Sequence, residues 1–194
     1  MTTARGRYAK GEQRRAQILA TALEVFTEGG FHGSSTREIA RRVGVTEPTL
    51  FHYFGSKQAL LAAVLAARDE RTPGPAGDLG RLLETVRDNA TEPDLVRLFA
   101  VTSAEATDPG HAAHDWFTAR YARLRSELAA GIAERAAAPE RAGAELTPDR
   151  VARLLVAAAD GLQIQWLLDR GPAGAAGIDM ADDLRALARA LLDR

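Results

Sequence analysis

The chain has 194 residues, of which 46% are hydrophobic and 26% charged, a balance typical of a globular protein and not of a disordered one. It contains no cysteine, which excludes disulfides, thiolate catalysis and cysteine-ligated metal sites. The net charge is −1, but it is unevenly distributed: residues 1–60 carry nine Lys/Arg and five Glu, a charge of +4, and the remainder carries −5. A basic N-terminal end either binds a polyanionic partner or is a solvated tail.

Membrane and export signals are not recognised in the sequence. The N-terminus is basic and polar, and we see no apolar run that approaches the roughly 18 residues needed to span a bilayer. We therefore expect a cytoplasmic protein with no membrane partner.

The first predicted helix covers residues 10–28. Ile18, Ala22 and Phe26 recur at intervals of four and give this helix one apolar face. Gly30 and the glycine before it provide the left-handed stop that commonly ends a helix. Arg5 to Lys10 would then form a basic N-terminal arm, which either contacts a polyanionic partner or stays an uninvolved tail.

A short second helix is predicted to begin after Ser35 and to end at Gly44. Ser35 and Glu38 have the spacing of a capping box, in which the serine hydroxyl accepts a backbone N–H and the glutamate carboxylate accepts another. Its inner face is predicted from Ile39 and Val43.

A third helix is predicted to follow a tight turn. Thr46 is its expected N-cap, and Pro48 falls in the first turn, where a missing N–H breaks no helical bond. Leu50 and Phe54 are four residues apart and should face inward, and Gly55 should end the helix.

The remainder of the chain is predicted to be helical throughout. Alanine, leucine and arginine dominate, and no alternating strand pattern is present, so the fold class is all-α with about nine helices. Two prolines and two glycines between residues 72 and 77 cannot continue a helix, so we expect a loop there. We expect a helix-turn-helix domain over residues 1–60 and a second helical domain over residues 61–194. The later helices are predicted near 57–65, 79–86, 95–102, 111–138, 148–170 and 178–193.

The segment 34–57 carries the functional signal. Helices of two turns cannot support themselves in water, so both must pack on neighbours. In a helix-turn-helix the second helix enters the major groove with its N-terminal residues at the base edges. The same pattern would also suit two small packing helices, with Tyr53 and Phe54 as core aromatics.

Residues 13–65 resemble the DNA-binding domain of the TetR family of repressors. The resemblance is in register over about fifty residues, whereas the C-terminal half diverges widely in this family. The matching residues are Arg15-Ala16-Gln17-Ile18-Leu19, Phe26, Gly30-Phe31, Ser35-Thr36-Arg37-Glu38-Ile39-Ala40, Gly44-Val45-Thr46, Thr49-Leu50-Phe51-His52-Tyr53-Phe54, Ser56-Lys57 and Leu60-Leu61.

The resemblance implies a set of DNA contacts. Departures from the family pattern at Glu47, Pro48 and Phe51 put the operator sequence in question, because Glu47 either accepts from a cytosine amino group or is repelled by phosphate. Phe51 replaces a common tyrosine and can contact a thymine methyl. The implied DNA-binding residues are Thr36, Thr46, Glu47, Pro48, Thr49, Phe51, His52, Tyr53 and Lys57.

The resemblance also implies a two-fold dimer and a small-molecule effector. The last two long helices, near 148–170 and 178–193, have apolar stripes suited to a four-helix interface, or to a monomer core. A dimer on an inverted-repeat operator reads enough bases for useful specificity. A small organic effector would bind in the C-terminal bundle and shift the population to a form with weaker DNA binding. Candidate lining residues, each of which is also a plausible core residue, are Phe99, Thr102, Trp116, Phe117, Arg120, Tyr121, Gln163 and Trp166.

Metal binding and catalysis are not expected, and no cofactor is expected either. His111 and His114 could share a helix face, but without cysteine they are better interpreted as capping and surface residues. No nucleophile elbow, phosphate loop or dinucleotide fingerprint is present. The alternative to a regulator is a helical ligand-binding bundle that acts as a protein–protein adaptor or an enzyme without operator binding.

Overall fold

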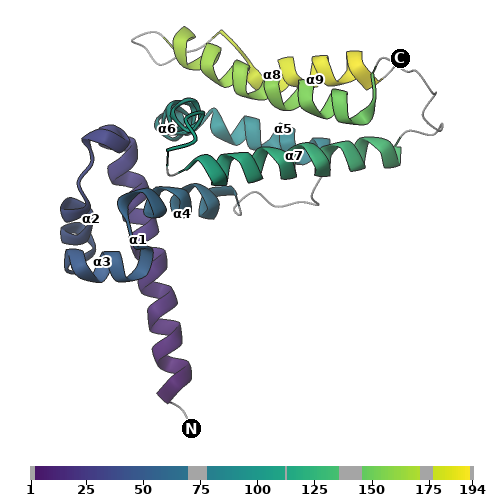
Figure 1. The fold of residues 1–194 in the computed structure, drawn as a ribbon. Helices are drawn as coiled ribbons and strands as arrows, with labels where there is room; N and C mark the ends of the chain where they lie inside the picture. Colours follow the sequence, from purple (N-terminus) through teal and green to yellow (C-terminus); the bar gives the residue numbers. More distant parts are fainter. Residues whose placement is uncertain (1–2, 70–77, 112, 136–145, 171–176, 193–194) are drawn as a thin grey trace. The chain divides into compact units, whose positions relative to one another are not determined.

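The computed structural model describes residues 3–69, 78–111, 113–135, 146–170 and 177–192. Over these residues every regular element is an α-helix, which confirms the all-α fold class (Figure 1). The helices are α1 (Thr3–Gly33), α2 (Thr36–Val43), α3 (Glu47–Phe54), α4 (Lys57–Asp69), α5 (Leu79–Asn89), α6 (Pro93–Glu105), α7 (His114–Arg135), α8 (Pro148–Asp169) and α9 (Met180–Leu192).

The helices belong to two compact units. Unit 1 comprises residues 1–71 and 101–114, and unit 2 comprises residues 72–100 and 115–194. The predicted domain boundary between residues 60 and 61 falls inside α4, which belongs whole to unit 1. Helix α6 runs without a break from one unit's residues into the other's.

The core of unit 1 is formed where α1 packs on α2 and α4. Ile18, Ala22 and Phe26 on α1 are fully buried, as their spacing predicted. Helix α1 begins at Thr3, so the predicted arm at residues 5–10 is part of the helix. Gly30 interrupts it with φ 68° and ψ 169°, a backbone conformation that is essentially restricted to glycine. The predicted helix end at this glycine is therefore wrong: the chain bends at Gly30, and α1 continues to Gly33.

The short helices have the caps that turn chemistry requires, with one exception. Gly44 ends α2 in the left-handed conformation, with its N–H on the carbonyls of Ala40 and Arg41. The predicted capping box at Ser35 and Glu38 is wrong, because the Ser35 side chain makes no cap hydrogen bond. Glu38 instead accepts from two arginines further along its own helix, and these charge-assisted bonds hold its carboxylate there.

The segment 101–114 is tied to the C-terminal end of α1 within unit 1. His32 Nε2 lies 3.2 Å from Glu105 Oε1, and the Phe31 and His111 rings meet edge to face at 6.4 Å between centroids. Thr102 is fully buried, and its hydroxyl oxygen has no hydrogen-bond partner among the residues that the structure describes.

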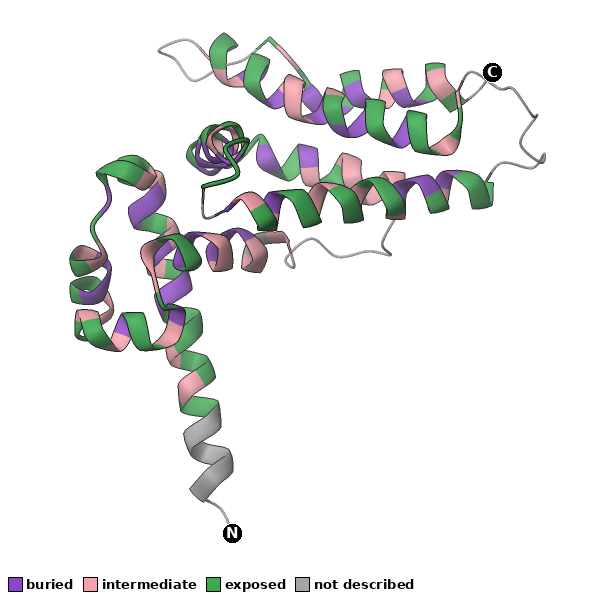
Figure 2. Cartoon of the chain, viewed as in Figure 1, coloured by how far each residue is buried: buried purple, intermediate pink, exposed green. Residues whose placement is uncertain are grey.

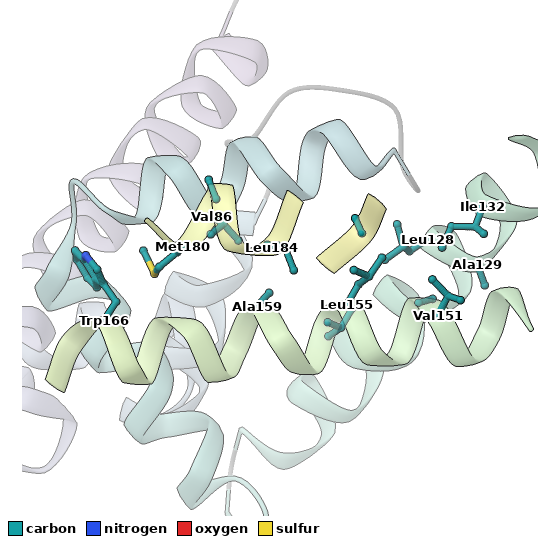
Figure 3. Close-up of a cluster of buried hydrophobic side chains, with 14 of the residues drawn as sticks. Val86, Leu128, Ala129, Ile132, Val151, Leu155, Ala159, Trp166, Met180 and Leu184 are labelled. Atoms are coloured by element: carbon teal, nitrogen blue, oxygen red, sulfur yellow. The ribbon is translucent and has the colours of Figure 1, made fainter. Parts of the chain in front are cut away.

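The core of unit 2 lies between α8, α9, α5 and the C-terminal half of α7 (Figure 3). Val151, Leu155, Ala159 and Trp166 recur along one face of α8 and are all buried. Leu184 of α9 is fully buried opposite them. This periodicity is that of an amphipathic core helix.

Helix α8 also has the length and composition of a membrane span. Its 22 residues have a mean hydropathy of 1.3 in the most apolar window, so the expectation that no segment approaches a spanning length is wrong for this helix. One face of α8 fills the core of unit 2, and its apolar character is what a helix buried in a globular unit requires.

Candidate DNA-binding surface

Helices α2 and α3 are joined by a three-residue turn and are held from inside. Ile39 and Leu50 are fully buried, and Phe54 is nearly so. The Val45 N–H donates to the Ala40 carbonyl across the turn at 2.9 Å. Each helix has eight residues, too few for a stable helix in isolation, so tertiary packing fixes their geometry.

The start of α3 is capped as predicted. The Thr46 hydroxyl accepts the Thr49 N–H at 3.3 Å, and the two threonine hydroxyls lie 2.8 Å apart. Pro48 is exposed in the first turn. These residues give α3 a short, rigid and polar N-terminal surface.

The outward side of α3 carries exposed residues (Figure 2). Phe51 is 37% exposed, His52 is exposed and Tyr53 is half-buried. The His52 and Tyr53 rings contact each other edge to face, with centroids 6.0 Å apart. Single exposed apolar residues are common on protein surfaces, so Phe51 counts here as a side chain available for apolar contact.

Glu47, the first residue of α3, turns back toward α2. Its carboxylate accepts a hydrogen bond from the Thr36 hydroxyl, and its other oxygen lies 3.8 Å from Arg37 Nε. The Glu47 side chain is 32% exposed and that of Arg37 is 87% exposed. Two residues predicted to contact DNA, Thr36 and Glu47, therefore contact each other. Arg37 was not singled out from the sequence, although its position directly after Thr36 could have indicated it.

Lys57 occupies a different position from the one its predicted role suggests. Its ammonium donates to the carbonyl oxygens of Phe31 and Ser34, at 2.5 and 2.6 Å, and lies 4.6 Å from the Phe31 ring centroid. Burial lowers the pKa of Lys57. An ammonium has three N–H donors, so one remains for a further acceptor such as phosphate.

Two further arginines of α2 are engaged with carboxylates, whereas Arg14 donates to the Val43 carbonyl and Arg15 lies over the Phe54 ring. Arg41 and Arg42 both donate to Glu38, and these hydrogen bonds lower the pKa of Glu38 to about 2. Arg42 also forms a two-bond ion pair with Glu28. Arg37 is thus the more exposed guanidinium at the start of α2.

Five of the eight residues proposed for an effector site form one cluster in unit 2. The Phe117 ring contacts the rings of Phe99, Trp116 and Tyr121, at centroid distances of 5.1, 4.8 and 6.2 Å. The Arg120 guanidinium lies 4.7 Å from the Phe99 ring centroid and 5.8 Å from the ring centroids of both Trp116 and Tyr121.

The other three lie elsewhere. Thr102 belongs to unit 1, and Trp166 lies in the core formed by α8 and α9. The Gln163 side-chain carbonyl accepts from the Asn89 amide at 3.1 Å in that unit's interior. No signal in the sequence indicated Asn89.

Asp160 is a polar neighbour of the aromatic cluster that the sequence did not single out. The Tyr121 hydroxyl donates to Asp160 Oδ2 at 2.7 Å. Burial raises the pKa of this carboxyl, against the opposing effects of the Tyr121 hydrogen bond and the Arg120 charge. An acid within the apolar stretch 154–162 of α8 was the available signal.

The two neighbouring histidines make local bonds. The His111 ring accepts the Ala113 N–H through Nδ1, and His114 Nδ1 lies 2.9 Å from the Ala106 carbonyl. In the described part of the chain, no group of three or more His, Asp or Glu residues could hold a metal ion.

Residues 18–64 match the model of a protein family that is described as bacterial regulatory proteins, tetR family. The chain is 44% identical over 61 residues to the transcriptional activator FasR of Mycolicibacterium smegmatis, and 42% identical over 64 residues to the transcriptional regulator RutR of Escherichia coli. These alignments cover 31% and 33% of this chain, and 28% and 30% of the relatives. The chain thus matches less than a third of the length of these curated relatives.

Solved structures resemble the chain over nearly its whole length. Salmonella enterica GusR is 25% identical, with a TM-score of 0.69 over 94% of this chain and 96% of GusR. A TetR-family regulator from Rhodococcus is 21% identical, with a TM-score of 0.72 over 93% and 99% of the two chains. A transcriptional regulator from Saccharomonospora viridis, crystallised with choline, is 23% identical, with a TM-score of 0.65 over 90% and 95%. The last two likenesses show a shared fold.

Proposed function

Since the chain belongs to the TetR family of transcriptional regulators by its helix-turn-helix segment, we propose that it binds an inverted-repeat operator in double-stranded DNA and is released by a small organic effector. The observation that carries the proposal is the α2–α3 pair, which lies within the matched residues and presents a capped, exposed recognition helix. The major groove admits one such helix. Repression is the simplest outcome, because a bound dimer would block a promoter.

The residues of α3 divide by the chemistry of their contacts. Thr46, Pro48 and Thr49, at its N-terminus, would approach base edges, and the exposed Phe51 would contact a thymine methyl. The contacts to phosphate or to the groove wall would come from Thr36, His52, Tyr53 and the remaining N–H of Lys57.

A second copy of the chain would pair through α8 and α9. Leu154, Ile164 and Leu168 lie on the side of α8 opposite its core face, and Leu168 is 81% exposed. Leu192 of α9 is also an exposed apolar residue. Apolar side chains spaced along one side of a helix are suited to a four-helix interface between two copies. Such a dimer would place two α3 helices, one from each copy, on one operator.

The effector would bind at the aromatic cluster of unit 2. Phe99, Trp116 and Tyr121 offer apolar faces, while Arg120 and Asp160 provide two polar groups of opposite charge. A few polar groups among aromatic rings suit a small organic molecule. Binding would favour a conformation with weaker DNA affinity, which is a population shift. A regulator of this kind would act in the cytoplasm.

The alternatives are an adaptor or an enzyme built on the same fold. The matched proteins are named as transcriptional regulators or activators, which favours regulation. A stable complex with a different protein and no operator would support the adaptor, and turnover of a bound ligand would support the enzyme.

The deciding experiment is selection of bound DNA from a random pool with the full-length chain. Enrichment of an inverted repeat supports the proposal, and the half-site spacing then reports the dimer geometry. If no sequence is enriched at low salt, operator binding is contradicted. The enriched duplex also serves as the probe for effectors that release the protein.

A further inference from the structure

The contact of Glu47 with α2 joins the first residues of both helices of the helix-turn-helix. Thr36 and Glu47 are 11 residues apart in the chain, and the turn brings the hydroxyl of one onto the carboxylate of the other. Arg37 Nε lies 3.8 Å from the second carboxylate oxygen. The carboxylate is thus held by a neutral donor and a guanidinium from the start of α2.

A carboxylate and a DNA phosphate are recognised by the same donors. A threonine hydroxyl and an arginine guanidinium are common phosphate ligands, and the N-terminal turn of a helix favours an anion. While Glu47 accepts from Thr36, that hydroxyl cannot donate to phosphate. The carboxylate also reduces the attraction of Arg37 for a second anion.

Glu47 has an alternative partner on DNA. As the first residue of α3 it lies beside Thr46, Pro48 and Thr49, the residues proposed to meet base edges. In the major groove the cytosine N4 amino group donates a hydrogen bond that a glutamate can accept. A duplex without a cytosine at that position offers the carboxylate no donor.

We propose that Glu47 determines operator specificity by changing partners. On non-operator DNA its carboxylate keeps the hydrogen bond of the Thr36 hydroxyl, which is then not offered to phosphate, and offsets part of the charge of Arg37. On the operator it accepts from a cytosine amino group in each half-site and leaves Thr36 and Arg37 to bind phosphate. This inference rests on the proposed DNA-binding function and adds a residue that makes phosphate affinity depend on base sequence.

The test compares Glu47→Met, which removes the charge and both acceptor oxygens of the side chain, with wild type on two duplexes of equal length, the selected operator and a random sequence, over a series of salt concentrations. Each phosphate contact contributes about 0.9 to the slope of log K against log salt. The variant's slope on the random duplex should therefore steepen by roughly one for each DNA-binding domain of the dimer. Its affinity for that duplex should rise about threefold to tenfold at low salt. Loss of the cytosine contact should lower the operator-to-random affinity ratio by roughly tenfold or more.

Glu24→Gln is the charge-matched control, because it removes one negative charge from the exposed side of α1 in the same unit. It should change neither the ratio nor the slope. A repeated selection with Glu47→Met should lose one cytosine preference in each half-site, because methionine offers the cytosine amino group no oxygen acceptor. An unchanged ratio, or an equal loss of affinity for both duplexes, contradicts the proposal.

Thr36→Val gives an independent measurement if Glu47→Met does not fold. It should weaken operator binding about threefold to tenfold and leave random-duplex binding unchanged, because Thr36 meets phosphate only on the operator. Equal weakening on both duplexes would overturn the proposal. If wild type itself selects no sequence, the DNA-binding function fails; if wild type selects an operator and these variants behave otherwise, only the role of Glu47 fails.

Discussion

The Tyr121 hydroxyl and the Asp160 carboxylate form a 2.7 Å hydrogen bond between α7 and α8, 39 residues apart in the chain. Burial nevertheless raises the pKa of Asp160 above its ordinary value of 3.8. The charged form of this acid is therefore less favourable in the folded unit than in the unfolded chain. This relationship has a direct consequence for stability against pH.

Unit 2 should lose stability as pH rises from about 4 through the raised pKa of Asp160, because the folded state binds its proton more tightly than the unfolded state does. Asp160→Asn should remove this decline, since asparagine stays neutral and its carbonyl can still accept from Tyr121. Both tryptophans, Trp116 and Trp166, lie in unit 2, so their fluorescence in urea reports its unfolding. Glu84→Gln, an exposed change on α5, should leave the pH dependence as in wild type.

Gly30→Ala should destabilise unit 1 by about 1–3 kcal/mol, because a side chain at φ 68° and ψ 169° is strained. Gly33→Ala is the matched control: its added Cβ would meet nothing within 4 Å, and its φ is not positive. Amide hydrogen exchange in α1–α4 measures the difference. Equal protection in the two variants would show that the kink carries no strain.

Leu168→Glu should convert the dimer to a monomer without unfolding unit 2, because the side chain is 81% exposed in the single chain. Light scattering measures the mass and tryptophan fluorescence the fold. Thr118→Glu places the same charge on an exposed position of α7 and should leave the dimer intact. A wild-type chain that is monomeric on DNA would contradict the interface.

Lys57→Met should destabilise unit 1 by about 1–3 kcal/mol, because the carbonyls of Phe31 and Ser34 lose a charged donor. Amide exchange at the end of α1 reports this loss. If the third N–H of Lys57 binds phosphate, the salt dependence of operator binding should also become shallower by about 0.9 for each DNA-binding domain of the dimer. An unchanged salt slope would remove Lys57 from the set of phosphate contacts.

Thr49→Ala should change which bases are selected, whereas Tyr53→Ala should weaken operator and random duplexes alike. Thr49 lies at the N-terminus of α3, where base edges are read, and Tyr53 lies a full turn further along. Parallel selections and salt titrations separate the two effects. If neither variant changes binding, α3 is not the reading helix.

Local features of the fold were predictable from the sequence because their causes are local. The Thr46 cap, the glycine end of α2 at Gly44 and the inward faces of Leu50 and Phe54 follow from spacings of a few residues. The Ser35 capping box failed because Glu38 has stronger partners three and four residues on.

The polar pairs of the site were not predictable in the same way. Thr36 meets Glu47 only once the turn between α2 and α3 has formed. Asn89 and Gln163 are 74 residues apart, and their hydrogen bond depends on the packing of whole helices. A single sequence carries the residue types for such pairs but not the pairing.

The division of unit 1 into two chain segments limits how this protein can be recombined with its relatives. A hybrid regulator that joined helices α1–α4 of this chain to the remainder of a relative at residues 70–77 would keep the DNA-binding helices. It would replace the segment 101–114. His32 and Phe31 would then face a foreign sequence in place of Glu105 and His111. Helices α1–α4 and the segment 101–114 should therefore be transferred together. We expect hybrids that carry both parts to be the ones that still respond to a new effector.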